Sequence, residues 1–98
     1  MSNEKGIAFF NTTADALVTR QDCLLWGVMV LASALGGDVT FYAGRDATSG
    51  RKIGTVKGGA TLTNPIMLGK PIFCDGGLYI DVGSSITEVT VFYEPLEG

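Results

Sequence analysis

Residues able to do chemistry are few in this 98-residue chain, which contains no histidine. Without histidine the commonest general base is missing, as are all Ser-His and Cys-His nucleophile pairs and most zinc sites. Four carboxylates on or near the last expected strands remain as acid–base candidates: Asp75, Asp81, Glu88 and Glu94. A glycosidase needs two carboxylates across a cleft, and the sequence marks out no such pair. We therefore predict that the protein is not an enzyme and has no metal or cofactor.

The two cysteines, Cys23 and Cys74, form no CxxC motif of a redox or metal site. The N-terminal stretch MSNEKGIAFFN has charges of both signs and lacks the apolar segment of a signal peptide. We therefore expect synthesis in a cytosol without secretion through a signal peptide. In that reducing compartment the two cysteines are expected to be buried thiols and not a disulfide.

The glycine-rich segment at residues 43–52, AGRDATSGRK, has a superficial likeness to a phosphate-binding loop. Five residues instead of four separate its glycines, Arg51 precedes the lysine, and no Ser or Thr follows. It lies between two apparent strands, 38–44 and 51–57, so we interpret it as the exposed tip of a hairpin. Arg45 at this tip could make polar contacts with a partner.

The charge of the chain also argues against two classes of partner, nucleic acids and anionic membranes. The net charge is −3, and the seven Lys and Arg residues are scattered apart from Arg51-Lys52. Nucleic acids and anionic membrane surfaces both require clustered cations. We therefore expect neither a nucleic acid nor a membrane as a partner.

The elements that must position any site are predicted to be β-strands. Fourteen glycines separate short β-branched and aromatic runs, and no segment has a convincing helical period. The expected strands are 5–11, 14–20, 23–32, 38–44, 51–57, 61–68, 71–74, 78–82 and 87–95. These predict one all-β domain over residues 1–98, with 1–5 as a flexible N-terminal arm. The expected fold is an antiparallel two-sheet sandwich or small barrel of about eight strands, Greek-key or jelly-roll-like.

The run CLLWGVMVLA, residues 23–32, is apolar throughout and too short to span a membrane as a helix. In regular alternation one face would hold Leu24, Trp26, Val28, Val30 and Ala32, and the other Cys23, Leu25, Gly27, Met29 and Leu31. Both faces of this strand would then be apolar, although only one can face the core. The second face needs a cover, which is either another part of the same chain or another subunit.

Two aromatic residues, Tyr79 and Phe92, are expected on the outward faces of their strands, because their neighbours alternate with them as core residues. Outward aromatic side chains fit a docking surface. They fit equally well a cross-strand pair that strengthens a sheet. The sequence does not decide between these two interpretations.

Two stretches, GGDVTFYAGRDATSGRKIGTVK and CDGGLYIDVGSSITEVTVFYEPLEG, together span most of residues 36–98. They resemble small structural proteins encoded in the head-and-tail gene blocks of tailed bacteriophages. The resemblance implies a β-domain of the virion, made in the host cytoplasm. It points to a capsid decoration (cement) protein that docks on the major capsid protein and stabilises the shell.

Other functions stay open on the sequence alone. A tail or head–tail connector subunit would form a ring through strand-to-strand contacts. A carbohydrate-binding module would need an exposed aromatic platform and often calcium-binding carboxylates. For the decoration protein we expect a homo-oligomer and partner contacts through seven residues: Ser2, Lys5, Trp26, Met29, Arg45, Tyr79 and Phe92.

Overall fold

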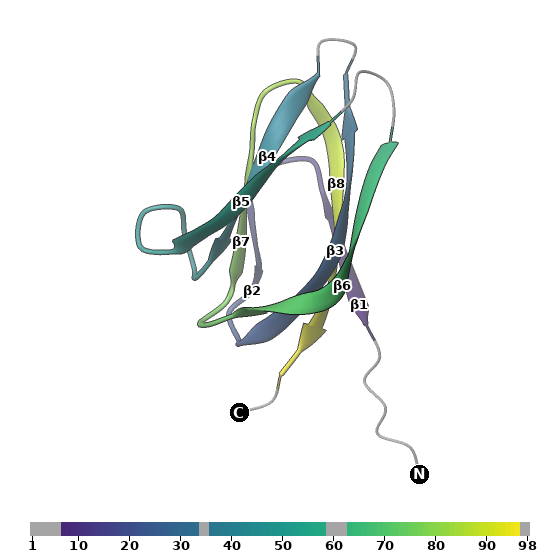
Figure 1. Cartoon of the computed structure of the whole chain (residues 1–98). Coiled ribbons are helices and arrows are strands. Elements are labelled where there is room, and N and C mark those ends of the chain that lie inside the picture. The colour runs from purple at the N-terminus through teal and green to yellow at the C-terminus, as the bar shows by residue number, and fades with distance from the viewer. Residues whose placement is uncertain (1–6, 34–35, 59–62, 97–98) are drawn as a thin grey trace.

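The computed structural model describes residues 7–33, 36–58 and 63–96, which form eight β-strands and no helix. The strands are β1 (Ala8–Thr12), β2 (Ala16–Thr19), β3 (Cys23–Ala32), β4 (Gly37–Ala43), β5 (Arg51–Gly58), β6 (Thr63–Cys74), β7 (Leu78–Val82) and β8 (Ile86–Pro95). They make two antiparallel four-stranded sheets that face each other, as Figure 1 shows. The predicted all-β sandwich is confirmed. Within the described residues, no helix is long and apolar enough to cross a membrane.

The strand orders are β1-β8-β3-β6 in one sheet and β2-β7-β4-β5 in the other. The chain therefore pairs as a long hairpin rolled up on itself: β4 with β5, β3 with β6, β2 with β7 and β1 with β8. The rolling adds two more pairs, β3 with β8 and β4 with β7. This is the jelly-roll arrangement of two packed sheets. All connections other than the β4–β5 hairpin pass from one sheet to the other.

The core lies between the sheets and is built by alternating side chains. Leu78 and Ile80 of β7 and Val89 and Val91 of β8 are fully buried there. They meet Val39, Phe41 and Ala43 of β4 and the inward residues of β3. Because the period of a strand is two, the residues between these positions must point away from the core. No polar or charged side chain of the described chain is buried.

In β3 the alternation reverses at Trp26. Leu25 pairs with Tyr93 and Gly27 pairs with Phe92, so Trp26 is an extra residue without a partner on β8. Such a bulge shifts every later side chain to the opposite face. The residues that face the core are therefore Cys23, Leu25, Val28, Val30 and Ala32, while Leu24, Met29 and Leu31 point outward. The regular alternation expected for residues 23–32 was wrong for this reason.

The segment expected as two strands, 61–68 and 71–74, is the single strand β6 (Thr63–Cys74). Its pairing with β3 jumps from Ile72, opposite Leu25, to Met67, opposite Gly27. The residues between, 68–71, have no register partner on β3 and stand opposite the single residue Trp26. β6 is an edge strand, which is where a strand containing prolines is tolerated.

Candidate docking surface

The outward side of the β1-β8-β3-β6 sheet carries an unusual number of large apolar side chains. We call this set the apolar face: Phe9 of β1; Phe92 of β8; Leu24, Trp26, Met29 and Leu31 of β3; and Met67 and Phe73 of β6. Phe9, Met67 and Phe73 are 71%, 60% and 52% exposed. Leu24, Trp26, Met29 and Leu31, the outward residues of β3, are half-buried, so the chain itself covers part of the second face of residues 23–32.

One row of the apolar face runs straight across the sheet. Phe9 is the register partner of Phe92, Phe92 of Gly27, and Gly27 of Met67. Gly27 has no side chain, and Met67 lies over it, with its Sδ only 2.5 Å from where a Cβ of residue 27 would stand. The glycine therefore provides the space into which Met67 folds, between the strands that carry Phe92 and Met67.

Trp26 joins the apolar face through its bulge. Its indole Nε1–H donates a hydrogen bond to Glu94 Oε1 at 3.1 Å, which satisfies the one polar atom of the side chain. Leu24 of β3 pairs with Glu94 of β8 on one side and with Phe73 of β6 on the other. The bond therefore holds the indole beside the Leu24–Phe73 pair.

The outward side of the β2-β7-β4-β5 sheet is different, because its side chains bind one another. Thr40 and Thr55 share a hydrogen bond between their hydroxyls at 3.1 Å. Tyr42 and Tyr79 are register partners with ring centroids 6.4 Å apart and planes tilted by 54°. Partial desolvation, followed by the carboxylates of Asp15 and Asp81, raises the pKa of the Tyr79 phenol. The geometry supports the cross-strand interpretation for Tyr79.

The structure therefore divides the residues predicted to contact a partner. It brings Trp26, Met29 and Phe92 together on the apolar face, whereas Tyr79 lies on the opposite outer face of the sandwich. Arg45 is exposed in the β4–β5 loop. Ser2 and Lys5 lie outside the described residues.

Five members of the apolar face were not predicted as contact residues: Phe9, Leu24, Leu31, Met67 and Phe73. Phe9 and Phe10 are adjacent aromatic residues, and only the register decides that Phe10 faces the core while Phe9 faces outward. The signal that could have identified Phe9 is Asn11, a polar residue of the same face, which donates a hydrogen bond to Thr90. Nothing in the local sequence of Met67 indicates that it covers a glycine of another strand.

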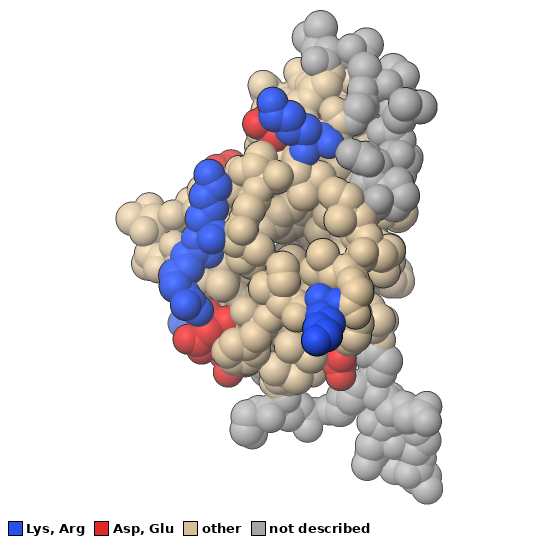
Figure 2. Space-filling model, viewed as in Figure 1, with Lys and Arg blue, Asp and Glu red and all other residues tan. Residues whose placement is uncertain are grey.

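The edges of the sheets are protected against pairing with another strand. β1 and β2 are short, with five and four residues. β5 carries the exposed Arg51, Lys52 and Lys57, and β6 carries the exposed Lys70. In Figure 2 Lys and Arg atoms gather over β5 and over the lower part of β6, with an uncharged, hollowed surface between them. Short or cationic edges disfavour the addition of another strand. Phe9, Met67 and Phe73 lie on the edge strands β1 and β6, but their exposed side chains lie on the outward face of the sheet.

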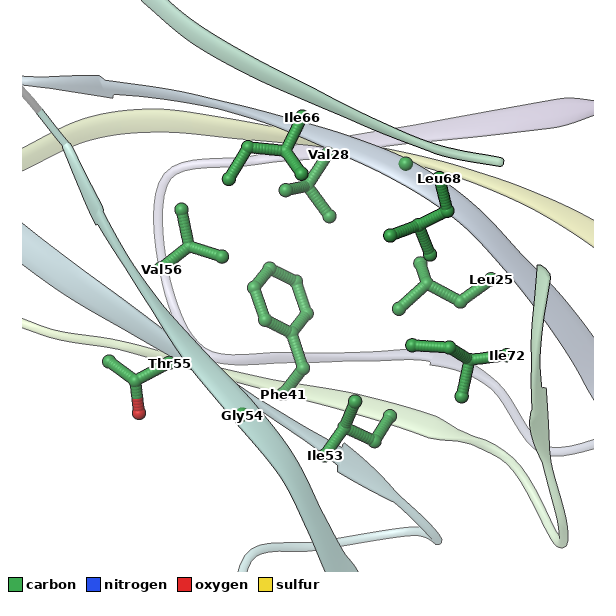
Figure 3. A pocket seen from close by; sticks show the side chains of 11 residues that line it. Leu25, Val28, Phe41, Ile53, Gly54, Thr55, Val56, Ile66, Leu68 and Ile72 are labelled. Atoms are coloured by element: carbon green, nitrogen blue, oxygen red, sulfur yellow. The ribbon is translucent and has the colours of Figure 1, made fainter. Parts of the chain in front are cut away.

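The hollow leads to an apolar cavity of about 130 Å³ between the sheets. Figure 3 shows its lining, which comes from β3, β4, β5 and β6: Leu25, Val28, Phe41, Ile53, Gly54, Thr55, Val56, Ile66, Leu68 and Ile72. The Thr55 hydroxyl points away from the cavity, toward its partner Thr40. The lining of the cavity is apolar apart from Thr55, whose hydroxyl is bonded to Thr40.

The carboxylates considered for acid–base chemistry are not brought together as a pair. Glu88 and Glu94 lie near opposite ends of β8, beside Leu31 and Leu24, while Asp81 lies on the other sheet opposite Thr40. In the described ranges no three His, Cys, Asp or Glu residues are grouped so that they could hold a metal ion.

In the β4–β5 loop, Asp46 Oδ1 accepts hydrogen bonds from the Ser49 amide at 2.7 Å and from the Ser49 hydroxyl at 2.9 Å. These bonds lower the pKa of Asp46. The arrangement is an Asp-stabilised turn, which agrees with the predicted hairpin tip.

Comparison with known proteins gives no relative: no family model, no curated protein and no solved structure matches this chain.

Proposed function

We propose that this protein is a non-enzymatic structural component of a virion, namely a capsid decoration protein that docks its apolar face on the major capsid protein. The observation that carries the proposal is the exposure of Phe9, Met67 and Phe73 on one face of the sheet. A small domain free in solution seldom leaves such side chains together on its surface, and contiguous exposed apolar patches mark interaction sites. The phage resemblance of residues 36–98 supplies the partner.

The size of the apolar face suggests how such a protein binds. Burying a largely exposed Phe or Met contributes about 1 to 2 kcal/mol, so these three side chains contribute roughly 3 to 6 kcal/mol. Association itself costs on the order of 4–15 kcal/mol. A single copy would therefore bind weakly through these residues alone. Repeated contacts by a homo-oligomer across a lattice of identical sites would convert this into stable attachment.

The edges of the sheets distinguish the proposal from its main alternative. A tail or connector ring built by strand-to-strand contacts needs an edge that accepts another strand. Of the four edge strands here, β1 and β2 are short, and β5 and β6 carry exposed Lys or Arg side chains. This pattern supports docking through a face over assembly through edges.

A carbohydrate-binding module is supported by one observation, the exposed aromatic rings of Phe9 and Phe73. Jelly rolls occur in lectins as well as in viral capsids, so the fold is an analogy for both. Sugars, however, need hydrogen-bonding groups beside the rings. The register partners of the two rings here are Phe92 and Leu24, and the nearby Asn11 and Glu94 side chains already bond Thr90 and Trp26, which favours a protein partner.

The test is co-sedimentation of the purified protein with expanded capsids produced from the source genome after deletion of this gene. Two charge-introducing variants are compared with the native protein: Phe9→Asp on the apolar face and Thr55→Asp on the opposite outer face. Both sites are exposed, so both variants should fold, which circular dichroism checks. We expect stoichiometric binding by the native protein and by Thr55→Asp, and loss of binding by Phe9→Asp.

Two outcomes contradict the proposal. If the folded native protein does not bind the capsids, the decoration function is wrong. If Phe9→Asp and Thr55→Asp bind equally well, the apolar face is not the docking surface. Sedimentation velocity of the free protein measures the expected homo-oligomer in the same preparations, and closed rings or tubes would favour the tail or connector alternative.

A further inference from the structure

The two thiols of the protein meet at one position of the sheet. Cys23 begins β3, Cys74 ends β6, and the two are direct register partners. Both side chains face the core and are 0% exposed. Both are free thiols. The Cys74 thiol donates a hydrogen bond to the Ile72 carbonyl at 3.6 Å, and the neighbouring Cys74 side chain, followed by burial, raises the pKa of the Cys23 thiol.

The backbone on both sides of this pair is fixed by further bonds. The Asp22 carboxylate accepts a hydrogen bond from the Gly76 amide at 2.8 Å, and the Asp22 carbonyl accepts one from the Leu96 amide at 3.0 Å. The next register pair, Leu24 with Phe73, continues the ladder in phase. The Asp22–Gly76 bond on one side and the Leu24–Phe73 pair on the other thus hold the two chain segments together on either side of the cysteines.

This geometry meets the requirements of a disulfide. Directly opposed residues of an antiparallel pair have Cα atoms about 4.5–5.5 Å apart, and disulfides join Cα atoms about 4.4–6.8 Å apart. We propose that Cys23 and Cys74 are an oxidative modification site, at which a small-molecule disulfide converts the two thiols into a cross-strand bond that fastens β6 to β3.

The reaction balances as two thiol–disulfide exchanges. One cysteine thiolate attacks a sulfur of the small disulfide, whose S–S bond breaks and releases the first small thiolate. The second cysteine thiolate attacks the protein sulfur of this mixed disulfide, forms the Cys23–Cys74 bond and releases the second small thiolate. The protein loses two electrons and two protons, and the small disulfide is reduced to two thiols.

Burial makes this oxidation slow. The small disulfide must reach sulfurs that are fully enclosed, and a raised thiol pKa leaves little thiolate. β6 is an edge strand bonded only to β3, so local opening of its end is enough to expose Cys74. The bond would then hold together two strands whose next residues, Leu24 and Phe73, belong to the apolar face.

The test incubates the folded native protein with oxidised glutathione and follows intact mass under non-reducing conditions. We expect a loss of two hydrogen atoms, about 2 Da, in a monomer, with a cross-linked peptide containing Cys23 and Cys74. The oxidised protein should melt about 10 °C or more above the reduced protein, because the bond closes a long loop of the unfolded chain. Dithiothreitol should reverse both changes.

Cys74→Ser and Cys74→Ala, each retaining one thiol, serve as matched controls and should show neither the mass loss nor the increase in melting temperature. The proposal is overturned if the folded native protein keeps both thiols under conditions that oxidise it in guanidinium. It is also overturned if the product is a disulfide-linked dimer, or if the intramolecular bond lowers the melting temperature.

Discussion

The two outer faces of this sandwich share one core, yet they differ in whether their outward side chains have partners within the chain. On the β2-β7-β4-β5 sheet, Thr40 bonds Thr55 and Tyr42 packs on Tyr79, so these four outward side chains have partners within the sheet. On the β1-β8-β3-β6 sheet, Phe9, Met67 and Phe73 remain exposed. The difference teaches that two faces of one sandwich can leave very different amounts of apolar side chain uncovered by the chain itself.

The largest effect is expected from filling the space that organises the apolar face. In Gly27→Ala the new Cβ would stand 2.5 Å from Met67 Sδ and 2.7 Å from the Ile66 carbonyl oxygen. Because the oxygen belongs to the backbone, β6 must shift, and we expect a loss of about 1–3 kcal/mol in the free energy of unfolding. Urea denaturation measures this loss.

Gly54→Ala is the matched control for that change. Its Cβ would meet no atom within 4 Å, since Gly54 borders the cavity between the sheets. We expect a gain of about 0.5–1 kcal/mol, because alanine restricts the unfolded chain and fits a strand better than glycine. Equal losses in both variants would show that the position of Met67 over Gly27 is not what matters.

Removing one aromatic ring from each outer face should have a smaller effect on the free energy of unfolding, and the effect should differ between the two faces. Tyr79→Ala removes a ring that packs on Tyr42, and we expect a loss of about 0.5–1.5 kcal/mol in unfolding free energy. Phe9→Ala removes a more exposed ring and should change the unfolding free energy by less than about 0.5 kcal/mol. Capsid binding should show the reverse order, with Tyr79→Ala binding normally and Phe9→Ala binding weakly. A binding defect in Tyr79→Ala would instead return Tyr79 to the docking surface.

The smallest effect concerns the exposed β4–β5 loop, which belongs to neither face. The pKa of Asp46 is lowered in the folded protein by its bonds from Ser49. Its contribution to stability is therefore complete above the ordinary pKa of 3.8 and is lost as the pH falls below it through the lowered value. Asp46→Ala should abolish this part of the acid dependence. Thermal melts of both proteins between neutral pH and pH 3, about one unit below that ordinary pKa, measure the difference.

Much of the fold could be predicted from the sequence because most strands obey local rules. Leu78, Ile80 and Val82 alternate with polar residues, and they form β7 with the expected inward side. The loop at residues 44–50 carries turn-forming residues and lies between paired strands. In these segments the pattern of a few neighbouring residues is enough to determine the structure.

The candidate site could be predicted only in part. Trp26, Met29 and Phe92 were predicted as partner contacts, but Trp26 and Met29 were expected on opposite faces of the strand. A run without polar residues contains no information about which side chain marks the bulge. The inversion at Trp26 arises from pairing with β8 and β6, which lie far along the chain. The exposure of Phe9 and Met67 depends likewise on residues in other strands, and no local pattern encodes it.

The nested pairing of the strands also bears on how the chain is made. β8 lies between β1 and β3, yet it is translated after every other strand. During synthesis CLLWGVMVLA therefore has one edge without a neighbour until β8 has left the ribosome. Pairings between such distant segments form slowly, and an unpaired apolar strand is prone to aggregate. We expect the nascent chain to need protection, by a chaperone or by rapid formation of the β4–β5 hairpin, until its last strand arrives.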